Sequence, residues 1–258
     1  MRTITATRYV TPLREGGSLP AIVEADDDGL YVLKFRGAGQ GRKALIAELL
    51  GGEIARAAGL PVPEIVFMQL DPDLARTEPD AEIQDLIKAS AGLNLALDYL
   101  PGSVTYDPLV HHPDADLASA IVWHDAFVAN VDRTARNSNL LMWHRGLWLI
   151  DHGAALIFHH QWDGFLERST RPFLMVKDHV LLGLASRIAE VDARMALSLS
   201  EATLRRIVAL VPDDWLEPHP AFATNAEHRE AYVRHFLARL ESPRHFVEEA
   251  LRARSMHL

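Results

Sequence analysis

The spacing of apolar residues changes part-way along the chain, and this change constrains the fold class most. In the first third, the apolar residues form short runs of strand length, Ala21–Glu24 and Leu30–Phe35, separated by the letters ADDDG. Such a pair with a turn-forming insert predicts a β-hairpin. From Ala44 to Gly59 the apolar residues recur at near-helical spacing, and LPVPEIVFMQLD then predicts another strand. We therefore expect an N-terminal lobe of antiparallel strands with one main helix.

The remainder of the chain is mostly helical in pattern. Residues Ala115–Asn130 predict a buried helix, and the runs LLMW and LWLI around HRG predict a hairpin. Four amphipathic helical patterns follow Lys177: DHVLLGLASRIAEV, SEATLRRIVALV, NAEHREAYVRHFLARL and PRHFVEEALRARSM. Ser198 and Glu201 have the spacing of a capping box at the start of the second pattern. The stretch DPDLARTEPDAEIQD is loop-like, with room for a short helix.

These patterns predict an α+β protein with two lobes. The strand NLALDYLPGS is broken by Pro101 and Gly102, so we expect the chain to pass between the lobes near Leu97–Gly102. The N-terminal lobe would comprise residues 1–100 and the helical C-terminal lobe residues 101–258. We find no internal repeat and no low-complexity linker.

Composition excludes several classes of function. The net charge of −9 argues against broad binding to nucleic acid. The absence of cysteine excludes disulfides, thiolate nucleophiles and thiolate metal sites. No apolar run approaches the roughly 18 residues that a membrane span requires, and MRTITATRYV lacks the features of a signal peptide. We therefore expect a cytoplasmic protein with no membrane insertion.

Lys34 lies within the apolar strand pattern YVLKF, which is an unusual place for a cation. Such a lysine either turns its charge outward to solvent or meets an anion. Glu48 lies on the apolar stretch of the following helical pattern, and Glu53 is an alternative partner farther along it. A lysine–glutamate pair of this kind positions the lysine against nucleotide phosphates in protein kinases.

The second polar group lies in NVDRTARNSNLLMWHRGLWLIDHG. Asp132 and Asn137 have the spacing of five that separates the catalytic aspartate from the metal-binding asparagine in kinases, and Asp151 follows the predicted hairpin. Mg²⁺ prefers a few hard oxygen ligands, so one carboxylate and one carboxamide suffice beside phosphate and water. A polar turn with a helix-capping aspartate would explain any one of these residues. It does not readily explain all three in this order after Lys34 and Glu48.

With these residues in place, the chain resembles the HipA-like kinases. The resemblance runs from about Arg14 to Trp215 and is carried by VLKF, AELLGGEIARAAGLPVPE, LALDYLPGS, DAFVANVDRTARNSNLL and LWLIDHGAAL. It implies the two-lobed fold that these enzymes share with protein kinases and phosphatidylinositol 3/4-kinases. Arg133, directly after Asp132, is similar to the D-R-x-x-x-N form of the lipid-kinase branch.

The resemblance also implies roles for individual residues. Lys34 would contact the phosphates of ATP, Glu48 would brace Lys34, and Asp132 would be the catalytic aspartate. Asn137 and Asp151 would hold Mg²⁺.

Two further segments would bind the nucleotide. Backbone groups of the hinge around Asp98, Tyr99 and Leu100 would bind adenine. No G-x-G-x-x-G precedes VLKF, so the candidate phosphate cover is Gly16, Gly17 and Ser18 in REGGSLP. The letters DHG replace D-F-G, and no A-P-E segment occurs.

The sequence contains one competing motif. Gly37, Gly39 and Gly41 follow a strand and precede a helix, as glycines do in dinucleotide-binding turns. Their spacing is G-x-G-x-G, and neither Ser nor Thr follows Lys43 as a P-loop requires. We therefore interpret GAGQG as a flexible loop followed by exposed Arg42 and Lys43.

The function we expect is transfer of the γ-phosphoryl group of ATP, with Mg²⁺, to a hydroxyl group. The acceptor would be a protein serine or threonine or a small molecule, and the sequence does not choose between them. Two alternatives stay open on the same fold: a non-catalytic nucleotide-binding pseudokinase or scaffold, and a nucleotidyl transferase.

Overall fold

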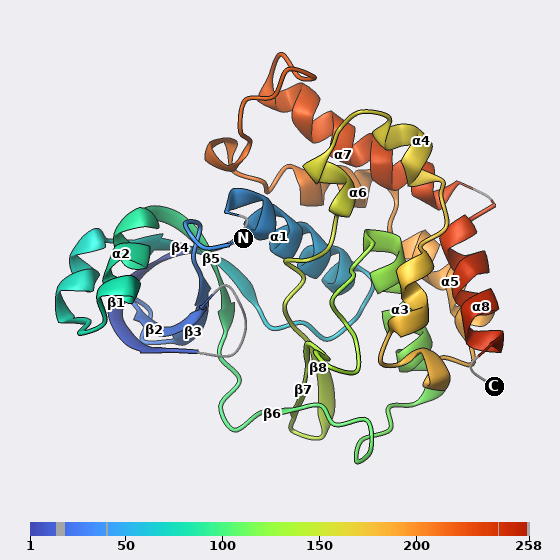
Figure 1. The fold of residues 1–258 in the computed structure, drawn as a ribbon, viewed down its shortest axis with the longest axis horizontal. Helices are drawn as coiled ribbons and strands as arrows, with labels where there is room; N and C mark the ends of the chain where they lie inside the picture. Colours follow the sequence, from blue (N-terminus) through green and yellow to red (C-terminus); the bar gives the residue numbers. More distant parts are fainter. Residues whose placement is uncertain (14–18, 40, 242, 257–258) are drawn as a thin grey trace.

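The computed structural model describes residues 1–13, 19–39, 41–241 and 243–256. A closed barrel of strands forms one lobe, and a larger group of helices forms the other (Figure 1). The order of elements along the chain is the expected one, with strands first and helices after them. The predicted α+β class is confirmed.

The barrel has the strand order β1-β2-β3-β5-β4. Its strands are β1 (Thr3–Pro12), β2 (Ala21–Ala25), β3 (Leu30–Lys34), β4 (Ile65–Leu70) and β5 (Gly92–Asp98). Four neighbouring pairs are antiparallel as expected, but β1 and β4 are parallel. Strand β1, whose side chains are mostly exposed, was not predicted. Its pairing with β4 closes the barrel and leaves no open sheet edge there.

One end of the barrel is covered by two short helices. The 3-10 helix η1 (Pro72–Thr77) and helix α2 (Ala81–Ala89) occupy the stretch expected to be a loop with a short helix. Asp71 and Asp80 cap them, because their carboxylates accept hydrogen bonds from the backbone two residues later. Ile83 and Ile87 of α2 pack into the barrel's own hydrophobic core.

Helix α1 (Arg42–Ala57) lies between the barrel and the helical lobe (Figure 1). It begins two residues before the predicted Ala44, so Arg42 and Lys43 are half-buried in its first turn and not exposed in a loop. The helix is followed by Gly59 at φ 79°, a left-handed conformation that favours glycine. The buried residues of α1 belong to the large core that fills the helical lobe. The division at residue 100 stays a prediction.

The helical lobe contains the predicted buried helix and the predicted hairpin. Its helices are α3 (Ala115–Val128), α4 (Phe165–Ser169), α5 (Ile188–Ser198), α6 (Glu201–Val208), α7 (Asn225–Leu240) and α8 (His245–Ser255). Strand β6 (Val104–Thr105) joins the hairpin of β7 (Leu140–Trp143) and β8 (Gly146–Leu149). Short 3-10 helices connect these elements: η2 (Ile157–His160), η3 (Leu174–Asp178), η4 (Leu182–Leu184) and η5 (Asp213–Trp215).

The predicted capping box was wrong. Helix α6 is capped by Ser200, whose hydroxyl accepts a hydrogen bond from the Thr203 N–H at 3.2 Å. Ser198 instead donates to the Met195 carbonyl in the last turn of α5. Glu201 pairs with Arg205 one turn along α6. The competing serine lies two residues farther on, which shifts the helix start by the same amount.

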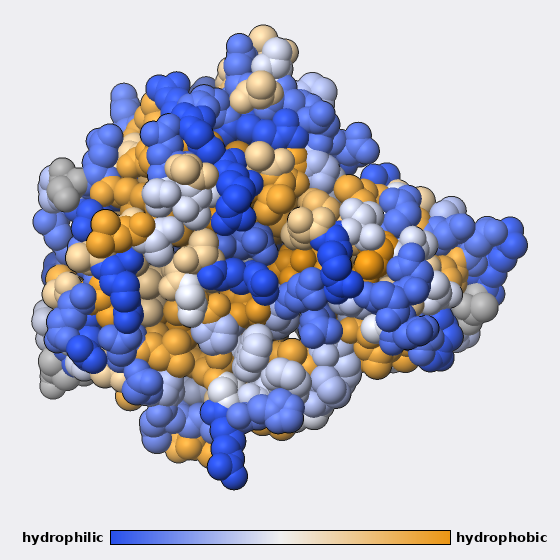
Figure 2. All heavy atoms as spheres, turned by 180° about the vertical axis from the view of Figure 1, so that it is seen from behind, coloured by the Kyte–Doolittle hydropathy of each residue, from blue (hydrophilic) through white to orange (hydrophobic). Residues whose placement is uncertain are grey.

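Contacts between distant segments hold the lobes together. The Trp215 indole N–H donates to the Leu93 carbonyl of β5 at 3.3 Å, and its ring lies edge-on to Phe67 of β4. On the face drawn in Figure 2, hydrophilic residues cover most of the surface and apolar residues show through in smaller groups. Within the described part of the chain, no helix is long and apolar enough to cross a membrane.

Two adjacent glycines let α1 approach its two neighbours closely: Gly51 faces the segment after β8, and Gly52 faces strand β4 of the barrel. A Cβ atom added at Gly51 would lie 2.8 Å from the Cβ of His152, and one at Gly52 would lie 2.4 Å from the Ile65 Cδ1 atom. Real Cβ atoms do not approach other heavy atoms this closely. The close packing of α1 against His152 and Ile65 therefore requires glycine at positions 51 and 52.

We predict that Gly51→Ala destabilises the protein, although alanine is the better helix former by about 1 kcal/mol. Overpacking of a tight contact costs roughly 1–3 kcal/mol, and the rigid backbone near His152 cannot give way easily. Urea denaturation should show a lower midpoint for Gly51→Ala. Gly183→Ala is the matched control, since nothing lies within 4 Å of its added Cβ. An unchanged or raised midpoint for Gly51→Ala would show that the contact is not tight.

Candidate active site

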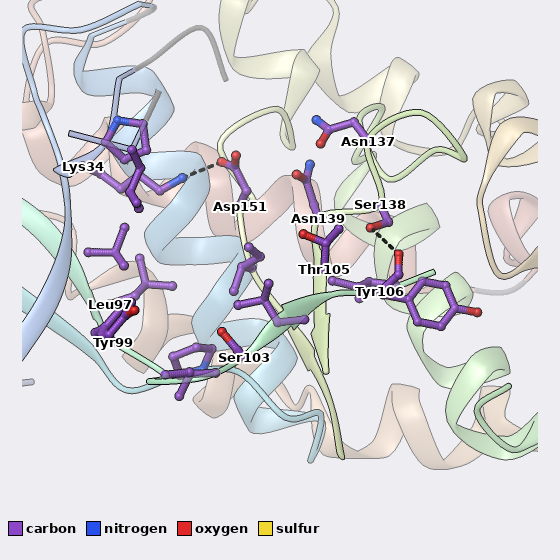
Figure 3. Close-up of a pocket in the computed structure, with 18 of the residues that line it drawn as sticks. Lys34, Leu97, Tyr99, Ser103, Thr105, Tyr106, Asn137, Ser138, Asn139 and Asp151 are labelled. Carbon is purple, nitrogen blue, oxygen red and sulfur yellow. Dashed lines mark hydrogen bonds and ion pairs between the residues drawn. The ribbon is translucent and has the colours of Figure 1, made fainter. Parts of the chain in front are cut away.

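A cleft of about 840 Å³ opens between the two lobes. The barrel contributes Val32, Lys34 and Leu97 to its walls, and the hairpin side contributes Ile150 and Asp151. Figure 3 shows Lys34 on one side of this space and Asn137, Asn139 and Asp151 on the other. Residues far apart in the sequence thus share one cavity.

Lys34 is the centre of a charge cluster at the cleft. Its Nζ atom lies 2.7 Å from the Asp151 Oδ1 atom and 3.8 Å from the Glu48 Oε2 atom. Glu48 is almost fully buried, with 2% of its side chain exposed. The alternative partner Glu53 pairs with Arg56 of its own helix instead. One ammonium group therefore links the barrel, α1 and the segment after β8.

The two charges of the Lys34–Glu48 pair favour each other strongly. Burial alone would lower the pKa of Lys34, but Glu48 and Asp151 outweigh burial and raise it. Burial alone would raise the pKa of Glu48, but the attraction of Lys34 dominates and lowers it to about 2. Burial lowers the pKa of His152, whose Nδ1 atom lies 3.8 Å from Glu48. The cluster therefore contains a charged lysine and a charged glutamate at neutral pH.

Asp132 lies in the loop before β7 and is held by two carboxamides. Asn137 Nδ2 donates to the Asp132 Oδ2 atom at 2.8 Å, and Asn139 Nδ2 donates to the same oxygen at 3.2 Å. The Asp132 N–H in turn donates to the Asn130 side chain. Both asparagines line the cleft, but Asp132 is not among the described residues that line it. The carboxylate thus lies directly behind the two carboxamides.

A buried ion pair between Arg133 and Asp125 holds the Asp132 loop in place. The Arg133 guanidinium donates to the Asp125 carboxylate of α3 and to the backbone carbonyls of Asn139 and Ile150. His179 lies 2.9 Å from the same carboxylate. Burial would raise the pKa of Asp125, but Arg133 in particular holds it well below its usual range. Breaking such a pair leaves an uncompensated buried charge. The network therefore anchors the loop and, through Asn139 and Ile150, both strands at the open end of the hairpin.

The hinge presents one open backbone donor. The Asp98 N–H donates to the Glu64 carbonyl at 2.8 Å, and the Tyr99 N–H donates to the Leu30 carbonyl at 2.9 Å. The Leu100 N–H has no acceptor within the described chain, and Leu100 lines the cleft. Of the three predicted hinge amides, only that of Leu100 is free to bind a ligand.

The other predicted site residues fall into two groups. Lys34, Glu48, Asn137 and Asp151 are brought to one place, as expected from the sequence. Gly16, Gly17 and Ser18 lie outside the described residues, so the phosphate cover stays a prediction.

Sequence reasoning missed three features of the site: Asn139, the Asp125–Arg133–His179 network and Arg136. Asn139 was overlooked because Asn137 already satisfied the expected spacing. The one available signal was its place directly before the apolar run LLMW. His179 could not be assigned, because 54 residues separate it from Asp125.

Comparison with known proteins identifies the family. The sequence pattern of one family, described as HipA-like kinase, matches residues 7–249. The chain belongs to the HipA-like kinase family. Its membership makes it a kinase-type phosphotransferase, which confirms that part of the expected function. No curated protein matches its sequence.

Solved structures with a similar fold are kinases. The Helicobacter pylori proinflammatory kinase CtkA is 13% identical, with a TM-score of 0.57 over 93% of this chain and 95% of that one. The Golgi casein kinase is 13% identical, with a TM-score of 0.51 over 96% of this chain and 74% of its own. Its structure with Mn/ADP bound gives a TM-score of 0.53 over the same shares, at 11% identity. At these identities the likeness establishes the protein kinase-like fold alone.

We predict that Glu48 contributes a definite part of the acid sensitivity of folding. A carboxyl group whose pKa is lower in the folded state stabilises the fold above its unfolded pKa, and this stabilisation is lost as the pH falls toward the folded value. With values near 4.5 and about 2, the free energy of unfolding should fall by about 2 kcal/mol between pH 6 and pH 3 through Glu48 alone.

Glu48→Gln should remove this contribution. Urea denaturation at both pH values would show a smaller fall in the variant than in the wild type, although Glu48→Gln starts from lower stability at pH 6. An identical fall in the two proteins would mean that Lys34 does not lower the pKa of Glu48.

Proposed function

We propose that this HipA-like kinase transfers the γ-phosphoryl group of ATP, bound with Mg²⁺, to a hydroxyl acceptor. The observation that carries the proposal is the Lys34–Asp151 ion pair of 2.7 Å, backed by buried Glu48 and facing the Asp132 loop across one cleft. A polar turn alone would not bring these residues together from three parts of the chain. Family membership and a related fold solved with Mn/ADP support the same conclusion.

The oxygen donors at the cleft fit a hard divalent cation. The Asp151 carboxylate is partly exposed, and the Asn137 side chain lies at the same cavity. One carboxylate and one carboxamide, with phosphate and water, match what Mg²⁺ prefers. Asp151 and Asn137 would hold the ion, which would offset the negative charge of the phosphates when bound.

The chain's own groups then have distinct tasks. Lys34 would neutralise phosphate charge, and Glu48 keeps its ammonium aimed at the cleft. The Leu100 N–H would donate to the adenine ring. Asp132 Oδ2 is occupied by the two asparagines, which leaves Oδ1 to orient the acceptor hydroxyl and take its proton.

The decisive experiment is incubation of the purified protein with labelled ATP, alone and with host-cell extract. We expect label from the γ-phosphate to reach the protein itself or one acceptor. Asp132→Ala should reduce this transfer about 10²–10⁴-fold, the usual contribution of a positioned base. Binding of Mg-ATP should persist in Asp132→Ala, because Asp132 is assigned to the acceptor and not to the nucleotide. A rise in melting temperature with Mg-ATP measures this binding.

The other outcomes each point to a different function. Transfer of label from the α-phosphate only would identify a nucleotidyl transferase. Nucleotide binding without transfer by the wild type would identify a pseudokinase or scaffold. Transfer that survives Asp132→Ala would mean that another residue is the base.

Arg136 is a further cation at the cleft. It precedes Asn137, lines the cavity and is exposed, and no carboxylate within the described chain contacts it. Lys34, by contrast, is already paired with two carboxylates. The planar guanidinium suits phosphate oxygens. We therefore assign Arg136 to the γ-phosphate, the group nearest the catalytic loop in the proposed reaction.

Arg136→Ala should weaken Mg-ATP binding about tenfold and leave Mg-ADP binding unchanged, since a hydrogen bond to a charged group contributes about 1.5–3 kcal/mol. Isothermal titration of both nucleotides measures the difference. Arg145→Ala, at the exposed turn between β7 and β8, is the matched control and should change neither affinity. Equal weakening of ATP and ADP would move the contact of Arg136 away from the γ-phosphate.

A further inference from the structure

Asn139 lies at the open end of the hairpin, opposite Ile150 and one residue away from the partner position of Asp151. It is the last residue before β7, and Asp151 follows β8 by two residues. Leu140 pairs with Leu149, and the Ile150 N–H then donates to the Asn139 carbonyl at 3.1 Å. The ladder thus continues to Asn139, and the side chains of Asn139 and Asp151 line the same cavity at the open end of the hairpin (Figure 3).

The backbone at both positions is unusual. Asn139 has φ 48° and Asp151 has φ 56°, so both are in the left-handed region that L residues rarely adopt. Residues in such conformations persist where the surrounding structure fixes them, and they cluster at functional sites. Here Arg133 fixes both, because its guanidinium donates to the carbonyls of Asn139 and of Ile150.

The side chain of Asn139 is oriented by its hydrogen bonds. It is 8% exposed, and its Nδ2 donates to the Asp132 carboxylate at 3.2 Å and to the Asp132 carbonyl at 3.3 Å. Both partners accept, so the nitrogen must face Asp132 and the Oδ1 atom must face away from it. No described residue donates to Oδ1, and this oxygen is not closed off from solvent, since Asn139 lines the cleft.

Asn137 satisfies the expected sequence spacing but is placed differently. It is exposed on the loop, three residues before β7, and its backbone is held by hydrogen bonds with Thr134 and not by the hairpin ladder. Its side chain makes one hydrogen bond among the described residues, from Nδ2 to the Asp132 Oδ2 atom at 2.8 Å. A preorganised oxygen is the better metal ligand, because less side-chain freedom is lost on binding.

We infer that the Asn139 carboxamide oxygen is a ligand of the catalytic metal ion, beside Asp151. This inference rests on the proposed function and deepens it. It transfers to Asn139 the role that the sequence spacing and the proposal above give to Asn137, whose main task is then to hold Asp132. A carboxamide oxygen and a carboxylate oxygen are the hard donors that Mg²⁺ and Mn²⁺ take.

The test is Mn²⁺ affinity in the presence of ADP, measured from the EPR signal of free Mn²⁺. Asn139→Gly should weaken Mn²⁺ binding about tenfold or more, and glycine accepts the left-handed backbone without strain. Asn137→Gly should weaken it less. Arg145→Gly, a left-handed position at the far end of the same hairpin, is the control for the backbone change.

Asn139→Asp separates ligation from a structural role. It tolerates the same backbone and keeps an oxygen donor, but it loses the amide that holds Asp132. Mn²⁺ affinity that is retained or increased in Asn139→Asp supports ligation. A loss equal to that in Asn139→Gly means that Asn139 acts through Asp132 and overturns the inference.

The remaining outcomes are also decisive. A large loss in Asn137→Gly with none in Asn139→Gly overturns the inference and leaves the proposed function intact. Equal losses in both variants support Asn139 as one of two carboxamide ligands. A wild-type protein that takes up no Mn²⁺ with ADP contradicts the proposed function itself. Melting temperatures of all variants verify that each protein is folded.

Discussion

The structure depends on one buried cation. Lys34 comes from a strand of the barrel, and its ammonium has few alternatives to the carboxylates of Glu48 and Asp151, because only 12% of its side chain is exposed. A buried charge is tolerated only with partners, and removing one partner of such a pair costs roughly 3–5 kcal/mol. The three segments that supply the cluster must therefore come together whenever the chain is folded.

Helix α1 connects this charge cluster to the core of the helical lobe. Glu48 lies 3.8 Å from Lys34 of the barrel and 3.8 Å from His152 in the segment after β8. Gly51, one turn later, permits the close approach of α1 to His152. His124 of α3 then meets the Gly51 carbonyl at 3.0 Å. The same helix that braces the lysine thus belongs to the core of the C-terminal lobe. The position of the N-terminal lobe is tied to the helical lobe through α1.

Much of this arrangement is predictable from the sequence, and the parts that are not have a common cause. The strand pattern around Lys34 and the helical spacing around Glu48 are local signals, so both elements were placed correctly. Strand β1 has few buried apolar residues, so its sequence gives little strand signal. It is held in the barrel by backbone pairing with β2 and β4. Its parallel partner in β4 could not be foreseen from local letters.

The site shows the same division. Asp132 and Asp151 are predicted because their spacing and order match a known chemistry, and the same spacing selects one asparagine, Asn137. The contacts that distinguish Asn139 from Asn137 are a carbonyl bond to Arg133 and a ladder bond to Ile150. Both depend on the folded hairpin. A spacing rule counts residues along the chain, whereas these contacts depend on where the hairpin ends.

On the proposed function, Asp151 has two partners in turn. Without nucleotide its Oδ1 atom neutralises Lys34 at 2.7 Å, while the Lys34–Glu48 distance is 3.8 Å. When a metal nucleotide binds, the phosphates would supply the negative charge that Lys34 needs, and the Asp151 carboxylate would be free to hold the metal. Each charge exchanges one partner for another, so none is left buried and unpaired. On this proposal, the charge cluster that joins the lobes would also be the site that receives a metal nucleotide.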